Sequence, residues 1–214
     1  MDRRIEKYFR LLQERPEEFI GSQQGEIVKD PVLMERIMLQ ENRALGVVYD
    51  SPYHLMVVDL LRTPDDRFQF YERVMNKVQN PSVVIIPIYH ESFILLHQYR
   101  HALQAMQYAF PRGFGEIGLN AEENARKELQ EELGCEVEKV ACLNSIVADS
   151  GMCGHAVSVC VAKLNDFETK KDYESIVDTI VLTESEMMEW IDKGKIDDAF
   201  TISAFCMWCL TKRH

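Results

Sequence analysis

GFGEIGLNAEENARKELQEELG, residues 113–134, carries three glycines in its first six positions and six glutamates in all. Residues three and four apart are neighbours on a helix, so Glu128, Glu131 and Glu132 fall on one face. Like charges at this spacing repel each other. The crowding therefore indicates either a solvated acidic face or a face that holds a cation.

The flanks of this stretch predict a helix with defined ends. Asn120 is a favourable N-cap, and Glu123 three residues later completes a variant of the capping box. Gly134 is a natural residue to end the helix. The apolar positions share one stripe that would pack on a sheet: Ala125, Leu129 and Leu133. The sequence thus predicts a helix with one apolar and one acidic side.

The acidic side suits a hard divalent cation, most naturally Mg²⁺. This ion prefers oxygen ligands, keeps several waters and shares its remaining coordination with the phosphates of a substrate. The loop PRGFGEIG, residues 111–118, has glycines that allow close backbone approach, so its N–H and C=O groups could reach the same metal or phosphates. A solvated helix face behind an ordinary strand–helix turn stays open as the alternative.

The bulk composition limits the possible partners. The 214 residues suit one sizeable domain, with or without a smaller appendage. A net charge of −11 argues against a nucleic-acid partner, which needs clustered Lys and Arg. The N-terminus lacks an apolar signal segment, and no apolar run approaches the roughly 18 residues of a membrane span. Six scattered cysteines indicate no dense disulfide framework and favour a reduced, cytoplasmic setting.

Hydrophobic periodicity along the chain predicts mixed helices and strands. Residues 2–19 and 30–45 are typical of helices, with a break at Pro16. Four β-branched and aromatic runs between about residues 53 and 100 predict antiparallel strands. Three further strands are expected after the glutamate-rich helix, within residues 136–183, and two helices close the chain, at about 184–194 and 198–212. This order indicates an α+β domain built in layers.

The spacing of residues 113–135 closely resembles the Nudix box, Gly-x5-Glu-x7-Arg-Glu-U-x-Glu-Glu-x-Gly-U, where U is apolar. Cys135 takes the final apolar position, whereas Leu119 replaces the first glutamate of the box and Lys127 replaces its arginine. Lysine keeps the charge but not the bidentate fork. The remaining signature positions match in register: Gly113, Glu128, Leu129, Glu131, Glu132 and Gly134.

The resemblance continues outside the box. Residues 82–103 are similar to a strand pair of ADP-ribose pyrophosphatase-like Nudix enzymes, including their Gln-Tyr-Arg, and residues 194–205 resemble their C-terminal helix entry. In place of their Glu-x-Pro-Ala-Gly this chain has YAFPRGF, which puts substrate selection in question. The resemblance implies a Nudix-like α/β/α sandwich with a mixed central sheet.

The implied organisation has three parts. Residues 1–45 are a helical N-terminal extension, and residues 46–80 are an antiparallel strand region that contributes to a dimer in relatives. Residues 81–214 are the Nudix hydrolase domain. The resemblance therefore also implies a homodimer.

The resemblance implies a Mg²⁺-dependent pyrophosphohydrolase, with Mn²⁺ as a substitute ion, that cleaves a nucleoside diphosphate derivative. ADP-ribose or a related nucleotide sugar is the first expectation for this small-molecule substrate. The alternatives are other dinucleotides, nucleoside triphosphates, or a Nudix-fold protein that senses such a ligand without turnover. The presence of Glu128, Glu131 and Glu132 in the box argues against the last of these.

Carried over residue by residue, the box implies the metal ligands. Glu128 and Glu132 are the first choices as metal ligands. Glu131 is the third, and it is also expected to have a catalytic role. The backbone carbonyl of Arg112, just before Gly113, takes the position of the loop ligand. Gly113 and the guanidinium groups of Arg112 and Arg100 are expected at the substrate phosphates.

The resemblance also implies a general base in a loop after the box, which here is NDFETKKDYESI, residues 165–176. The candidates in this loop are Glu168, Asp172 and Glu174, of which Asp172 and Glu174 are favoured. Glu116 in the glycine loop is a further acid within reach. Each of them alone also fits a solvated loop carboxylate.

Overall fold

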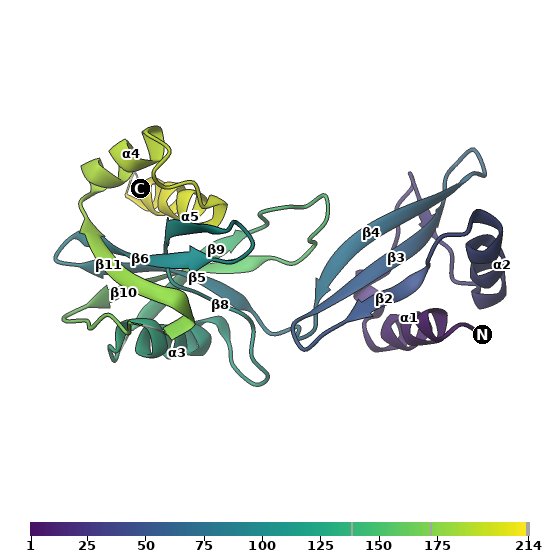
Figure 1. The fold of residues 1–214 in the computed structure, drawn as a ribbon, viewed down its shortest axis with the longest axis horizontal. Coiled ribbons are helices and arrows are strands. Elements are labelled where there is room, and N and C mark those ends of the chain that lie inside the picture. The colour runs from purple at the N-terminus through teal and green to yellow at the C-terminus, as the bar shows by residue number, and fades with distance from the viewer. Residues whose placement is uncertain (138, 172, 213–214) are drawn as a thin grey trace. The chain divides into compact units, whose positions relative to one another are not determined.

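The computed structural model describes residues 1–137, 139–171 and 173–212 (Figure 1). Within it the chain forms two compact units. Unit 1 comprises residues 1–77 together with 149–155, and unit 2 comprises residues 78–148 and 156–214. In the described residues no helix is both long and apolar enough to cross a bilayer.

Unit 1 is an antiparallel sheet covered by helices. Strand β3 pairs with β1, β2 and β4, and the pairing with β4 runs along the full length of β3. Residues from α1, α2 and the strands share one hydrophobic core. The elements are α1 (Arg3–Glu14), η1 (Pro16–Glu18), β1 (Glu26–Ile27), α2 (Pro31–Glu41), β2 (Gly46–Asp50), β3 (His54–Arg62) and β4 (Phe68–Asn76).

Both helices of unit 1 begin at an aspartate that the sequence supplies as an N-cap. The side chain of Asp2 accepts from Arg4 N, and that of Asp30 accepts from Val32 N and Leu33 N. Because side-chain caps satisfy N–H groups that lack intrahelical partners, these residues set where α1 and α2 start. The helices around residues 2–19 and 30–45 are therefore confirmed, including the break at Pro16.

Unit 2 contains a mixed seven-stranded sheet within the described residues. Its order is β11-β6-β5-β10-β9, with β7 on β6 and β8 on β5; β10 and β5 are parallel and the other pairs antiparallel. The strands are β5 (Ser82–Tyr89), β6 (Ser92–Arg100), β7 (Ala105–Ala109), β8 (Arg112–Gly113), β9 (Val140–Ile146), β10 (Val157–Leu164) and β11 (Ile176–Leu182).

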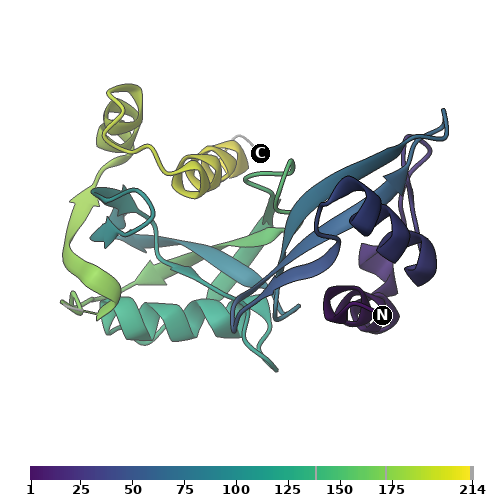
Figure 2. The ribbon, with the colours of Figure 1, turned by 45° about the vertical axis from the view of Figure 1, so that its right-hand side comes forward.

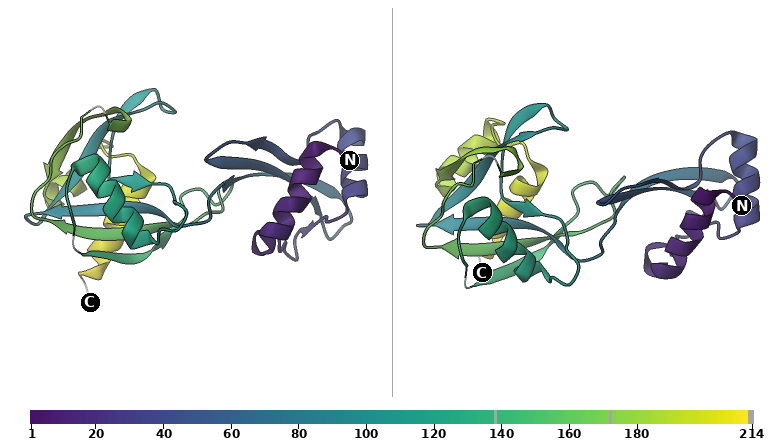
Figure 3. Two further views of the ribbon diagram at one scale, coloured as in Figure 1. Left: turned by 90° about the horizontal axis from the view of Figure 1, so that it is seen from below. Right: turned by 60° about the horizontal axis from the view of Figure 1, so that its bottom comes forward.

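Helices lie on both faces of this sheet, as Figures 2 and 3 show. On one face α3 (Ala121–Leu133) packs through Ala125, Leu129 and Leu133 into a core with β5, β6 and β10. On the other face α4 (Glu184–Asp192) and α5 (Ala199–Thr211) cover a second core that includes Phe93 and Phe205. The predicted α+β, Nudix-like α/β/α sandwich with a mixed sheet is confirmed.

The four strands expected between residues 53 and 100 all form, but they belong to two sheets. β3 and β4 pair in unit 1, and β5 and β6 pair in unit 2. The division into a helical extension (1–45), a strand region (46–80) and a Nudix domain (81–214) stays a prediction.

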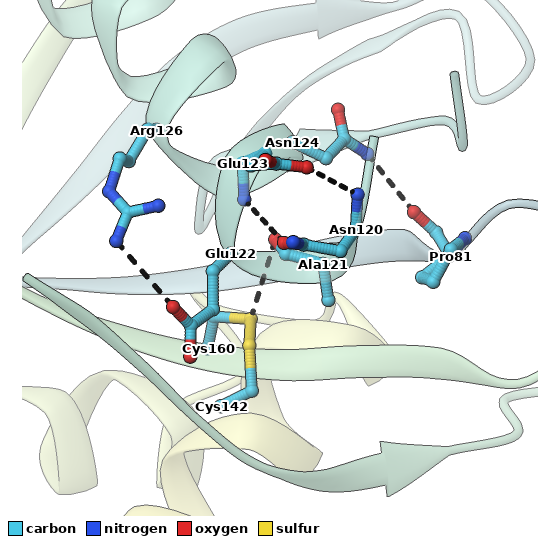
Figure 4. The surroundings of a disulfide bond; sticks show 9 residues. All are labelled: Pro81, Asn120, Ala121, Glu122, Glu123, Asn124, Arg126, Cys142 and Cys160. Atoms are coloured by element: carbon cyan, nitrogen blue, oxygen red, sulfur yellow. Dashed lines mark hydrogen bonds and ion pairs between the residues drawn. A yellow bond between two sulfur atoms is a disulfide. The ribbon is translucent and has the colours of Figure 1, made fainter. Parts of the chain in front are cut away.

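One pair of cysteines departs from the expected reduced state. Cys142 on β9 and Cys160 on β10 form a disulfide below the start of α3 (Figure 4). They are direct register partners with Cα atoms 4.0 Å apart. Composition could not reveal this pairing, because the pairing depends on the strand register. Because of this disulfide, the cysteines no longer support a reduced setting.

Candidate metal and substrate site

The acidic helix α3 is held at both ends. Glu123 N donates to Asn120 Oδ1 (3.0 Å) and Asn120 N donates to Glu123 Oε2 (2.9 Å), so both halves of the predicted capping box are present (Figure 4). Gly134 ends the helix in the left-handed region with φ of 61°. The apolar stripe is fully buried on the sheet, which turns the box glutamates toward the loops at one edge.

Two of these glutamates are buried to an unusual degree. Glu128 and Glu132 are 8% and 2% exposed. Burial, with smaller contributions from neighbouring carboxylates, raises the pKa of Glu128 to about 7 and that of Glu132 to about 9. Oε2 of Glu132 has no hydrogen-bond partner among the described residues. A buried carboxylate without a partner costs free energy, and a bound cation would offset that cost.

The donor set fits Mg²⁺ only if water and substrate complete the coordination. Among the residues the structure describes, no three His, Cys, Asp or Glu side chains converge closely enough to hold an ion alone. Mg²⁺ is usually held by one or two carboxylates plus waters and substrate phosphates. Glu128 and Glu132 are such a partial set.

The glycine loop lies directly on the acidic face. A Cβ at Gly113 would lie 2.0 Å from Oε1 of Glu128, so only glycine allows this approach. Strand β8 fixes the loop to β5, with Gly113 opposite Val83 and Arg112 opposite Val84. The structure thus brings the predicted loop position at Arg112 and Gly113 next to the predicted ligand Glu128.

Asn124 of α3 holds the glycine loop in place through hydrogen bonds. The sequence pattern did not suggest this role. Its side chain is fully buried, and Nδ2 donates to the carbonyls of Phe114 (2.8 Å) and Pro81 (3.1 Å). The link to Pro81 is drawn in Figure 4. An asparagine within a helix gives no signal of its own, because its partners come from segments distant in sequence.

The two predicted arginines meet at the same edge. Arg112 forms an ion pair with Asp198 (Nη1 to Oδ1, 3.3 Å), the N-cap of α5, and its guanidinium lies 4.9 Å from the ring centroid of Phe200. The pKa of Arg100 is lowered, chiefly by burial and then by the charge of Arg112, and the charges of Asp198 and Glu132 offset only part of this effect. Two guanidinium groups within electrostatic range of each other favour an anion nearby.

The third box glutamate, Glu131, is held by two neighbours, Lys127 and Tyr173. Lys127 Nζ contacts Oε2 of Glu131 at 2.7 Å and Oε1 of Glu116 at 2.8 Å, and the hydroxyl of Tyr173 donates to Oε2 of Glu131 at 3.0 Å. Lys127 and Glu131, four residues apart on α3, thus form an ion pair along the helix. Glu116 lies with this ion cluster. Tyr173 carried no signal in the sequence because it lies in an irregular, charged loop.

The three candidate bases differ in their surroundings. Asp172 lies outside the described residues. Glu168 is exposed and pairs with Lys170 (2.7 Å). The negative charge of Glu174 contributes to the raised pKa of both Glu128 and Glu132, which places Glu174 within electrostatic range of the acidic face.

The chain is similar to several known proteins. A family model of the NUDIX domain matches residues 78–199. The methanol dehydrogenase activator of Bacillus methanolicus is 32% identical over 132 residues, which cover 59% of this chain and 71% of that protein. The ADP-sugar pyrophosphatase of Mus musculus is 25% identical over 135 residues, 58% of this chain and 62% of that protein. A solved structure of an ADP compounds hydrolase superposes with a TM-score of 0.65 at 18% identity, covering 79% of this chain and 92% of that one.

Proposed function

This chain is a pyrophosphohydrolase of the Nudix family, and on that premise we propose that it hydrolyses the pyrophosphate of ADP-ribose or a related nucleotide sugar in a Mg²⁺-dependent reaction. The observation that supports this proposal most strongly is the burial of Glu128 and Glu132 within electrostatic range of two arginines, Arg100 and Arg112. An acidic face next to a cationic pair fits a substrate that brings both phosphates and a divalent ion.

Glu128 and Glu132 would hold the ion, with Glu131 and the carbonyl of Arg112 as further ligands. Mn²⁺ would serve as a substitute ion. When bound, such an ion neutralises phosphate oxygens and lowers the pKa of water. The raised pKa values of the two glutamates describe the protein without an ion, since a cation favours their ionised forms.

The side chains of the protein supply binding, orientation and proton transfer. Arg100 and Arg112 would bind the non-bridging oxygens of the pyrophosphate, and the ion pair with Asp198 orients the guanidinium of Arg112. Glu174, or Asp172, would accept the proton of the attacking water. The water oxygen bonds to one phosphorus while the bridging P–O bond breaks, so that two monophosphates leave.

The choice of an ADP-linked substrate has two supports. The relative from Mus musculus is named for ADP-sugars, and the superposed structure for ADP compounds. The YAFPRGF segment departs from the ADP-ribose pattern, so other dinucleotides and nucleoside triphosphates are tested alongside. Ligand sensing without turnover is a further outcome. The homodimer and the cytoplasmic location stay predictions.

The direct test is a substrate panel. The purified protein is incubated with Mg²⁺ and ADP-ribose, other nucleotide sugars, dinucleotides or nucleoside triphosphates, and the released monophosphates are measured. We expect the fastest turnover with an ADP-linked sugar and none after removal of divalent ions. Glu132→Gln should remove activity while the chain stays folded. Absence of turnover with every compound would overturn the proposal, and full activity of Glu132→Gln would overturn the metal assignment.

A further inference from the structure

The loop between β10 and β11 is attached to the last turn of the acidic helix. Glu168 N donates to the carbonyl of Leu133 (2.7 Å), and Lys170 N donates to the carbonyl of Glu132 (3.2 Å). Carbonyls at the end of a helix lack intrahelical partners, so these two bonds cap α3. The loop that carries the candidate bases is thereby joined to the residues that carry the candidate metal ligands.

Gly134 permits this attachment. Its φ of 61° lies in the left-handed region, and a Cβ at this position would lie 2.6 Å from Cε of Lys170. Any larger residue would therefore be strained in its backbone and would have to displace the end of the Lys170 side chain. The glycine near the end of the Nudix box thus also makes room for the side chain of Lys170.

Tyr173 adds a side-chain attachment to these backbone bonds. Its hydroxyl donates to Oε2 of Glu131 (3.0 Å), the oxygen that also accepts from Lys127 Nζ (2.7 Å). The ring of Tyr173 packs, partly buried, against the core on the α3 side of the sheet. Positions 131, 132 and 133 of the helix are thus each bonded to a different residue of the loop.

The chain turns sharply directly after Tyr173. Glu174 and Ser175 both have positive φ, 45° and 64°, a conformation that non-glycine residues seldom adopt and that persists only where the surroundings enforce it. Strand β11 begins at the next residue, Ile176. Glu174 is therefore confined between the Tyr173 anchor on one side and the start of a strand on the other.

We propose that Tyr173 is a positioning residue: its hydroxyl bond to Glu131 fixes the strained turn at Glu174 and so holds that carboxylate against the acidic face of α3. The inference rests on the proposed function, in which Glu174 accepts a proton from the attacking water. Tyr173 itself touches neither the water nor the substrate in this account. It acts through Glu174.

Tyr173→Phe removes only the hydroxyl. With the best substrate of the panel, we expect kcat to fall about tenfold, equivalent to about 1.4 kcal/mol, while KM changes less than about twofold. Tyr71→Phe is the matched control, because it removes another tyrosine hydroxyl bonded to a loop, at Gly151 O (2.8 Å), in unit 1. It should leave kcat unchanged. A rise in KM with unchanged kcat in Tyr173→Phe would overturn the proposal.

A double-mutant cycle separates positioning from a general structural role. In a Glu174→Gln background, the hydroxyl of Tyr173 should have nothing left to position, so adding Tyr173→Phe should change kcat less than about twofold. An equal loss of kcat in both backgrounds would show that Tyr173 does not act through Glu174, and would overturn the inference.

Hydrogen exchange tests the anchor without any substrate. Amides of residues 165–175 should exchange faster in Tyr173→Phe than in the wild type, while those of α4 stay the same. Unchanged exchange in the loop would show that the hydrogen bond from Tyr173 to Glu131 does not hold the loop in place. If the wild type hydrolysed nothing in the panel, the proposed function would fail. Hydrogen exchange would still decide whether Tyr173 holds the loop against α3.

Discussion

The space where Gly113 would carry a side chain is filled by the carboxylate of Glu128. A Cβ built on Gly113 would meet Oε1, Cδ and Cγ of Glu128 at 2.0, 2.3 and 2.5 Å. The first and the sixteenth residues of the Nudix box are thus in direct contact. The glycine is present because the backbone of the loop must approach a buried carboxylate.

Gly113→Ala should therefore damage the site more than the fold. We expect destabilisation of about 1–3 kcal/mol from overpacking, and a fall in kcat of about a hundredfold because Glu128 is displaced. Thermal unfolding and turnover of the same preparation measure both effects. Gly154→Ala is the control, since a Cβ there would meet nothing within 4 Å. Equal activity of the two variants would contradict the proposed geometry.

Stability of the metal-free protein should fall as the pH rises. The pKa values of Glu128 and Glu132 are raised to about 7 and about 9, so the folded state retains protons that the unfolded state releases above about pH 4.5. Each raised pKa thus makes unfolding more favourable with increasing pH, up to about 7 for Glu128 and about 9 for Glu132.

Thermal unfolding with a chelator, measured from about pH 5 to about pH 9, should show this decline. Mg²⁺ should raise Tm more at the high end of the range, because metal binding competes with protons for the carboxylates. Glu132→Gln should flatten the decline above pH 7. A gain from Mg²⁺ that does not depend on pH would argue against these glutamates as ligands.

Arg112→Lys should weaken substrate binding. Lysine keeps the charge but loses the planar fork that lies over Phe200 and pairs with Asp198. We expect KM to rise about tenfold, equivalent to about 1.4 kcal/mol. Arg126→Lys is the control, because the ion pair of Arg126 with Glu122 (3.5 Å) lies on the helix surface, where such a pair contributes little. Equal KM values for the two variants would remove Arg112 from the substrate site.

Local signals in the sequence were enough to predict the elements that carry the site. Asn120 and Gly134 define the two ends of α3 through contacts within a few residues, and the β-branched and aromatic runs SVVIIPIY and SFILLHQYR predicted β5 and β6. The Nudix spacing then assigned roles to Glu128 and Glu132 before any distance was known. Patterns of this kind depend on helix and strand periodicity, which the chain expresses locally.

Contacts between distant segments had no such signal. The bond between Cys142 and Cys160 depends on the register of β9 and β10, and the hydrogen bond from Tyr173 to Glu131 depends on the path of an irregular loop. Short strands with weak patterns, β1, β7 and β8 among them, were likewise not resolved as separate elements. Except for β7, which pairs with the neighbouring strand β6, the decisive partner lies many residues away, where composition and periodicity carry no information.

The last prediction concerns the core of unit 1. Asp59 is 2% exposed and is satisfied by two partners: the hydroxyl of Tyr8 donates to Oδ1 (2.6 Å), and Arg73 Nε donates to Oδ2 (2.6 Å). Asp59→Ala leaves a largely buried guanidinium and a buried hydroxyl without this acceptor. Removing one partner of a buried ion pair costs about 3–5 kcal/mol, so we expect a loss in this range.

Chemical denaturation measures this loss, and Asp50→Ala is the matched control. Asp50 also contacts two cations, Lys7 (2.7 Å) and Lys77 (2.5 Å), but on the surface, where such pairs contribute about 0–1 kcal/mol. The difference between the two variants therefore isolates the effect of burial. An equally small loss of unfolding free energy in both variants would contradict this prediction. It would mean that Tyr8 and Arg73 find water or other partners at little cost once Asp59 is removed.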